Sequence, residues 1–228
     1  MIDTSGWEYF YKVDYRGGHK VTTNMLYTPT VNAEHTMMCM LWDELHPYQE
    51  ENTRLTKELV DFFFEREVVH LSKFQKFDWA TKLIEVDSVG RRIFIEFTGE
   101  TINDILSNPN RSLDNECPDW KEQIFTIVQD IVSTGHYKMA LYPHCFFLVD
   151  GRIKTFDFYS CISKEERYIS KSIIAGLIGP ESIERFAIAT VDGKIDFEVF
   201  FKNTIRYQLD KTWPDNPFPE YYKRLFND

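Results

Sequence analysis

The sequence predicts an α+β fold with a β-rich, antiparallel N-terminal part, one long helix and a mainly helical C-terminal part. Three observations predict it. Short β-branched and aromatic runs alternate with turns over residues 6–42. Apolar residues recur at helical spacing over 53–76 and 119–133. A turn dipeptide joins two β-rich runs within 146–158. At 43% apolar content, 228 residues can build a core for one large domain or two small lobes.

The N-terminal strands are predicted from alternating side chains and from turn residues. The diglycine Gly17-Gly18 predicts a turn, and Pro29 is expected to close the second strand. The expected strands are residues 7–13, 21–27 and 36–42. Together they predict a small antiparallel sheet.

The first long helix is predicted over residues 53–76. Asn52 or Thr53 can cap its start, because their side chains accept hydrogen bonds from the first free N–H groups. Its expected apolar stripe comprises Leu55, Leu59, Phe62, Phe63, Val68, Val69, Leu71 and Phe74.

A second hairpin is predicted from residues 81–86 and 91–97, across Ser88-Val89-Gly90. A glycine turn and a short helix follow at 98–106, and a polar loop covers 107–117. The next helix runs from Asp119 or Pro118 to Ser133, where Gly135 stops it. Its expected inner face is Trp120, Ile124, Phe125, Val128, Ile131 and Val132.

The hairpin signal at Asp150-Gly151 ends in a carboxylate between two phenylalanines. Phe146–Val149 and Arg152–Phe158 are its expected strands, with Asp157 in the sequence Phe-Asp-Phe. A carboxylate among aromatic side chains needs a partner, which can be a metal, a cation or backbone N–H groups. The alternative is an aspartate that caps the turn at the strand end.

Helices are expected in the C-terminal part, over residues 165–178, 182–189, 197–209 and 221–226, with a turn at 214–219. Gly179-Pro180 would end the first of them. Trp213, Tyr221 and Tyr222 are expected at the surface, where they would suit a protein partner.

Composition excludes some classes of function. A formal net charge of −10 argues against nucleic-acid binding by bulk electrostatics. The four cysteines, which are scattered along the chain, favour reduced, buried thiols. Met1-Ile2-Asp3 does not begin a signal peptide, and no apolar run reaches membrane-spanning length. We therefore expect a cytoplasmic protein that does not contact a membrane.

Residues 135–159 resemble the catalytic-loop and metal-loop region of the protein-kinase-like fold. Without a gap, Ala140 falls at the family's catalytic aspartate and Cys145 at its metal-binding asparagine. Asp157 and Phe158 match the family's Asp-Phe pair, and Tyr159 replaces the glycine that follows.

Upstream segments resemble the same family in the same order. Glu67, with Glu65 as second choice, matches the C-helix glutamate that pairs with a strand lysine, and Glu96 and Thr98 match the adenine-binding hinge. The resemblance implies a two-lobe fold: residues 1–98 form a β-rich lobe with a C-helix-like helix, and 99–228 a reduced, mainly helical lobe. It implies ATP and Mg²⁺ as cofactors, bound weakly or not at all. Cofactor-binding residues would be Asp157, Glu67, Glu96 and Thr98, with Asp157 also the metal ligand.

The charges needed for phosphoryl transfer are largely missing. Residues 21–53 contain no lysine or arginine, so Met40 or a neighbour stands at the strand-lysine position unless Lys12 or Lys20 reaches in. Glu67 would then be a solvated or arginine-paired carboxylate. No catalytic residue is therefore expected. The resemblance implies a degenerate, pseudokinase-like domain that binds a nucleotide, a partner protein or both.

Two other functions fit the residues. An atypical phosphotransferase would use Asp157 as metal ligand and His144 or His136 as base or ligand. An unrelated α+β interaction protein would use Asp157 only structurally. Two motifs are fainter echoes of the family, a phosphate loop at 16–19 and an activation segment ending at 179–181.

Overall fold

A computed structural model describes much of the chain. The described residues are 1–10, 13–16, 19–22, 27–42, 56–166, 168–170, 190–191, 194–196, 199, 201–203, 209, 212–214 and 224. The chain divides into two compact units. The first comprises Met1–Pro118 and His144–Tyr159, and the second comprises Asp119–Pro143 and Ser160–Asp228. Each unit is therefore built from two separate stretches of sequence.

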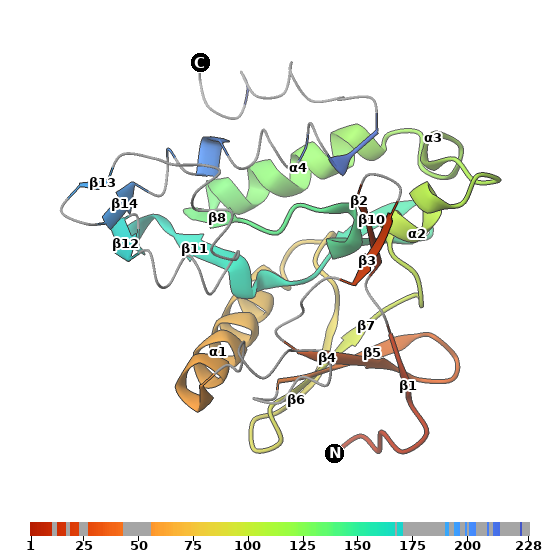
Figure 1. Cartoon of the computed structure of the whole chain (residues 1–228), viewed down its shortest axis with the longest axis horizontal. Coiled ribbons are helices and arrows are strands. Elements are labelled where there is room, and N and C mark those ends of the chain that lie inside the picture. Colours follow the sequence, from red (N-terminus) through yellow and green to blue (C-terminus); the bar gives the residue numbers. More distant parts are fainter. Residues whose placement is uncertain are drawn as a thin grey trace. The chain divides into compact units, whose positions relative to one another are not determined.

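The first unit contains a five-stranded antiparallel sheet (Figure 1). Its strands, in spatial order, are β1 (Glu8–Tyr9), β4 (Thr28–Val31), β5 (Met37–Leu41), β7 (Arg92–Glu96) and β6 (Leu83–Asp87). The side chains of strands β5 and β7 are mostly buried, and both strands have a neighbouring strand on each side. The α+β class with an antiparallel sheet is confirmed, whereas the two-lobe arrangement stays a prediction.

The third predicted strand is confirmed as β5. Of the second, predicted over 21–27, residues 21–22 belong to β3 (His19–Thr22), residues 23–26 lie outside the described residues, and Tyr27 precedes β4. Strand β3 pairs with β2 (Val13–Arg16), with Arg16 opposite His19. A hairpin therefore flanks Gly17-Gly18, which themselves lie outside the described residues.

Pro29 does not close a strand as predicted but lies inside β4, opposite Met40. Its carbonyl accepts a hydrogen bond from the Phe10 N–H (3.0 Å). Because the N and C=O of one strand residue face the same side, the missing N–H of Pro29 also faces the β1 side. Strand β1 ends at Tyr9, so the lost donor falls at the end of a short edge strand, where a proline is tolerated.

Helix α1 spans Lys57–Phe74, and Thr56 is its N-cap: the hydroxyl accepts from the Leu59 N–H at 3.3 Å. The predicted caps Asn52 and Thr53 lie outside the described residues. The buried face is Val60, Phe63, Phe64, Glu67, His70, Leu71 and Phe74. Val69, predicted inside, is 61% exposed. The buried face is thus rotated from the predicted one, and it includes a glutamate.

Both predicted hairpins of the first unit are confirmed. Strands β6 and β7 pair antiparallel, and β9 (Phe146–Val149) pairs antiparallel with β10 (Arg152–Thr155). Asp150 and Gly151 have φ of 48° and 75°, and two positive values in succession characterise a type I′ turn. Helix α2 spans Ile102–Ser107, and the predicted polar loop contains the short helix α3, Leu113–Glu116.

The second unit contains helix α4 (Trp120–Ser133). As predicted, Gly135 (φ 81°) follows the end of this helix. Strand β8 (His136–Lys138) follows and pairs antiparallel with β11 (Cys161–Ser163). Trp213 was wrongly predicted to be exposed. It is 4% exposed, stacks on Trp120 at 5.4 Å and donates its Nε1–H to the Leu141 carbonyl at 2.9 Å. Tyr221 and Tyr222 lie outside the described residues.

The helix predicted over 165–178 was wrong where the structure describes it. Residues Tyr168–Ser170 form β12, which pairs with β14 (Lys194–Asp196), and β14 pairs with β13 (Thr190–Val191). Tyrosine and isoleucine favour strands, and a distant pairing partner overrides a short helical pattern. The 171–189 stretch, with Gly179-Pro180-Glu181, lies outside the described residues. Helical residues within the range predicted at 197–209 are Val199, Phe201–Asn203 and Leu209.

The four cysteines all lie in the described part of the chain, where they are buried, as predicted, and are not joined in disulfides. Burial raises the pKa of the Cys39 thiol to about 11, so this side chain stays protonated. Among the described helices, none combines the length and apolar composition that crossing a bilayer requires.

Candidate functional site

Asp157 lies directly after β10 in a left-handed backbone conformation, with φ of 65°. Its side chain is 2% exposed, and the neighbouring Phe156 and Phe158 are fully buried. Aspartate is one of the few residues other than glycine that tolerate this conformation. The flanking rings pack against further aromatic side chains of the same unit, namely Phe74, Trp79, Phe97 and Phe147. The two residues that flank Asp157 are therefore anchored in the core of the first unit.

The Tyr27 hydroxyl donates a hydrogen bond to Oδ1 of Asp157, across 130 residues of sequence. Tyr27 is 1% exposed, and its ring packs on Trp42 at 5.1 Å. Burial, followed by the charge of Asp157, holds the pKa of Tyr27 well above its usual value. The hydroxyl therefore remains a donor. A neutral hydroxyl was not among the partners considered from the sequence, and no sequence spacing pointed to it.

Glu67 on α1 is fully buried and accepts the Tyr159 N–H at 2.5 Å. The adjacent Arg66 donates its Nε–H to the Tyr159 carbonyl at 3.2 Å. Helix α1 thus holds both backbone groups of Tyr159. The alternative of a solvated Glu67 was wrong, whereas Glu65 is exposed. The signal for burial was present, because Glu67 lies four residues after Phe63 and four before Leu71 on one helix face.

The position expected for the strand lysine lies on β5, which contains no lysine. Met40 is fully buried there and stands opposite Pro29 and Ile93 in the sheet. Lys12 lies outside the described residues, as does the side chain of Lys20. A methionine cannot neutralise a phosphate, so β5 contributes no charge to a site of this kind.

Cys145, which the sequence matched to the family's metal-binding asparagine, is 1% exposed. Its carbonyl accepts from the Thr155 Oγ1–H at 2.9 Å and from the Phe156 N–H at 3.3 Å, which closes the base of the β9–β10 hairpin. The adjacent His144 is 8% exposed. In the second unit, His136 is 6% exposed and its Nδ1 lies 3.0 Å from the Thr134 carbonyl.

Ala140, at the family's catalytic position, belongs to the second unit. Its N–H donates to the Ser160 hydroxyl at 3.2 Å. A methyl side chain can neither accept a proton nor coordinate a metal, so this position contributes only its backbone.

Glu96 and Thr98, which the sequence matched to the hinge, differ in whether their backbone N–H and C=O groups already form hydrogen bonds. The Glu96 N–H donates to the Lys82 carbonyl (2.9 Å), and its own carbonyl accepts from the Thr81 hydroxyl (2.7 Å). Its carboxylate pairs with Lys154 at 2.6 Å. Thr98 is exposed, and within the described part of the chain its backbone makes no hydrogen bond. Thr98 can therefore offer both groups to a ligand, whereas those of Glu96 already bind within the fold.

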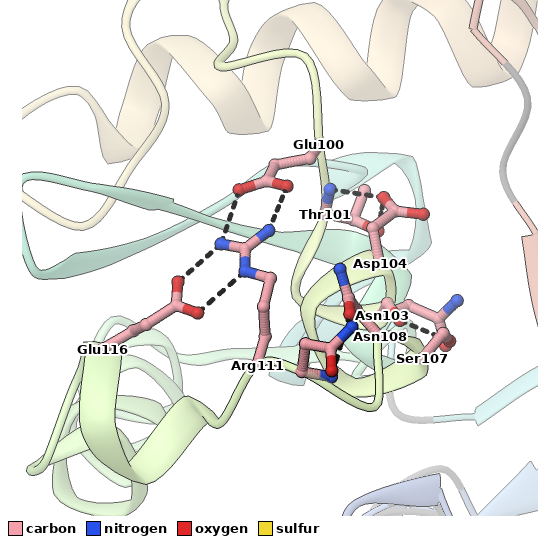
Figure 2. A network of polar contacts seen from close by, with 9 residues as sticks. Glu100, Thr101, Asn103, Asp104, Ser107, Asn108, Arg111 and Glu116 are labelled. Atoms are coloured by element: carbon pink, nitrogen blue, oxygen red, sulfur yellow. Dashed lines mark hydrogen bonds and ion pairs between the residues drawn. The ribbon is translucent and has the colours of Figure 1, made fainter.

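A polar network after Thr98 was missed from the sequence. Figure 2 shows the Arg111 guanidinium between two carboxylates: Glu100 at 2.6 and 3.0 Å, and Glu116 at 2.5 and 2.8 Å. Both pairs are bidentate, the strongest geometry for such contacts. They raise the pKa of Arg111 far above its usual value, and Arg111 lowers that of Glu116. Sequence separations of 11 and 5 residues follow no helix or strand rule.

The residues present do not fit a Mg²⁺ ion. Mg²⁺ requires six oxygen ligands in near-octahedral geometry and usually keeps several waters. Asp157 is almost fully buried and already accepts the Tyr27 hydroxyl, and Cys145 is a soft ligand. Among the described residues, no group of three or more His, Cys, Asp or Glu side chains comes together. Metal binding at Asp157 stays a prediction.

Comparison with known proteins gives a distant likeness only. No model of a known protein family matches the sequence, and no curated protein does. Among solved structures, the bifunctional kinase-methyltransferase WbdD matches with a TM-score of 0.47 and 13% identity, over 79% of this chain and 42% of that one. WbdD in a co-crystal with the kinase inhibitor LY294002 matches with 0.44 and 12%, over 82% and 46%.

The chain thus spans less than half the length of these WbdD structures. At such identity and TM-score the likeness does not assign the chain to a family.

Proposed function

We propose that this chain is a kinase-like domain that has lost phosphoryl transfer and acts by binding a nucleotide, a partner protein or both. The observation that carries the proposal is the hydrogen bond between Glu67 and the Tyr159 N–H. Glu67 was matched to the family's C-helix, and Asp157-Phe158-Tyr159 was matched separately to its metal loop. These two matches lie 92 residues apart in sequence and meet in the first unit.

The proposed loss of catalysis follows from the side chains at the matched positions. Phosphoryl transfer depends on charges fixed around the reacting group, and removing one such group commonly costs about a hundredfold or more in rate. Ala140 and Met40 carry no charge, and Cys145 is a buried thiol. Several such losses together support a binding function.

Nucleotide binding, if retained, would use the hinge backbone. The free N–H and C=O of Thr98 are groups that an adenine edge can pair with. We therefore propose Thr98 as the main contact and Glu96 as its support, with weak ATP binding. The alternative is that the domain acts by binding a partner protein.

A melting-temperature series with ATP and ADP, each with and without Mg²⁺, tests the proposal on the whole chain. A ligand that binds only the folded state raises the melting temperature. We expect a small rise with nucleotide and no phosphate transfer from ATP. Transfer that disappears in Asp157→Ala would overturn the proposal in favour of a phosphotransferase. No rise with any nucleotide would leave protein binding alone.

Two glycine variants locate the nucleotide. Gly99 has φ of 80°, and a Cβ there would lie 2.6–2.9 Å from the His35 side chain, so Gly99→Ala must reshape the turn after Thr98. Gly151 has a similar φ of 75° with nothing within 4 Å, which makes Gly151→Ala the matched control for backbone strain. Hinge binding predicts that only Gly99→Ala reduces the rise with ATP.

A further inference from the structure

We propose that Tyr27 caps Asp157 and that the carboxylate serves the fold rather than a metal. The proposal rests on the proposed function and deepens it, because it states why a matched metal-loop aspartate persists in a domain without phosphoryl transfer. The cap joins the segment before β4 to the loop after β10.

The first step concerns how the buried Asp157 carboxylate is stabilised by a hydrogen-bond donor. A buried carboxylate is destabilised unless hydrogen bonds or opposite charge offset its desolvation. Asp157 and Tyr27 are 2% and 1% exposed, so their hydrogen bond forms away from water. Hydrogen bonds to a charged acceptor are roughly twice as strong as neutral ones. The Tyr27 hydroxyl can therefore offset much of the cost.

The second step is the character of the surroundings. Phe158, the next residue in the chain, packs on Phe74 at 5.1 Å and on Trp79 at 6.3 Å, and Asp157 itself is only 2% exposed. Hydrated Mg²⁺ needs oxygen ligands and space for its waters, which a carboxylate buried to this degree does not offer. The phenol of Tyr27 suits a buried carboxylate, because its apolar ring can be buried at little cost while its hydroxyl donates a hydrogen bond.

The third step concerns the loop after β10, which contains both Asp157 and Tyr159. Tyr27 holds Asp157, and two residues later Glu67 and Arg66 hold the Tyr159 backbone. The Tyr159 ring lies edge-on to Trp42 at 5.6 Å, and Trp42 also packs on Tyr27. The loop is thus fastened from the sheet side and from α1. An aspartate in a left-handed conformation suits this place better than a larger residue.

A double-mutant cycle tests the cap by equilibrium unfolding in urea. Tyr27→Phe removes only the donor, and we expect it to raise the unfolding constant about tenfold or more. In an Asp157→Ala background the same change should have little effect. Asp157→Asn keeps an acceptor and tolerates the left-handed conformation, so it should cost less than Asp157→Ala.

Metal titrations give an independent readout that does not need the destabilised variants. Mg²⁺ and Mn²⁺ should leave the melting temperatures of the wild type and of Asp157→Asn equally unchanged. A Mn²⁺-dependent rise in the wild type that Asp157→Asn abolishes would overturn the cap, as would a neutral Tyr27→Phe. Phosphate transfer, measured separately, bears on the proposed function and not on this hydrogen bond.

Discussion

The Asp157 site and the Arg111 network each hold two carboxylates in the first unit, but they hold them in opposite ways. Asp157 and Glu67 are 2% and 0% exposed, and the partners identified for them are a hydroxyl and a backbone amide. The side chains of Glu100 and Glu116 are 40% and 29% exposed, and both bind one guanidinium (Figure 2).

The difference shows how exposure selects the partner of a carboxylate. Near water, an arginine is desolvated only slightly and gains two bidentate contacts. In a fully buried place a second ion would carry its own desolvation cost, whereas a dipole already fixed by the fold does not. Changes at the buried site should therefore cost more stability than changes in the exposed network.

The largest effect is expected at Phe158, which is fully buried beside Asp157. Phe158→Ala should lower the free energy of unfolding by about 3–5 kcal/mol, because it leaves a cavity between Phe74 and Trp79. Equilibrium unfolding in urea measures this loss of free energy. Tyr9→Ala removes a side chain that is 54% exposed and serves as control. Equal costs for the two variants would contradict a core role for the loop.

The next effect is expected at Glu67. Glu67→Ala removes the acceptor of the Tyr159 N–H and should cost roughly 2 kcal/mol in unfolding free energy. Hydrogen exchange at the Tyr159 amide should accelerate in parallel. Glu67→Gln keeps an acceptor of the same length and should retain most of the protection. Unchanged exchange in Glu67→Ala would show that this hydrogen bond does not hold the loop.

A smaller effect is expected at Arg111, because its partners are partly in water. Arg111→Met should cost on the order of 1 kcal/mol at low salt, and less at high salt. Arg111→Lys keeps the charge but not the bidentate geometry, so it should fall in between. A cost that salt does not reduce would contradict the electrostatic origin.

The smallest effect is a pH dependence of that cost. The hydrogen bonds from Arg111 lower the folded pKa of Glu116 below its usual value. A carboxylate with a lowered folded pKa stabilises the fold above its unfolded pKa, and this stabilisation is lost as the pH falls through the folded value. The difference between wild type and Arg111→Met should therefore shrink between pH 7 and pH 3. A difference that grows on acidification would show the opposite sign.

Local patterns predicted much of the fold. Helix α4 and its glycine stop, the hairpins β6–β7 and β9–β10, and strand β5 all depend on neighbours close in sequence. The failures share a cause. Strand β12 is fixed by pairing with β14, which lies more than twenty residues further on, and four apolar residues at helical spacing could not outweigh that pairing.

The candidate site shows the same limit. The Phe-Asp-Phe sequence predicted that Asp157 would need a partner, but it did not point to the Tyr27 hydroxyl, which lies 130 residues away. Glu67 could be matched to a family motif, yet its burial followed only from the position of the helix face. The roles of Asp157, Glu67, Glu96 and Thr98 in binding stay predictions.

The sequence by itself determined the turns, the helix ends and the place of Asp157 between two phenylalanines, because backbone preferences and side-chain periodicity act over a few residues. Tertiary structure decided that Tyr27 meets Asp157, that Glu67 meets Tyr159 and that Trp213 is buried. Those contacts join segments whose separation along the chain carries no periodic signal, and their energies depend on a burial that exists only once the units have folded.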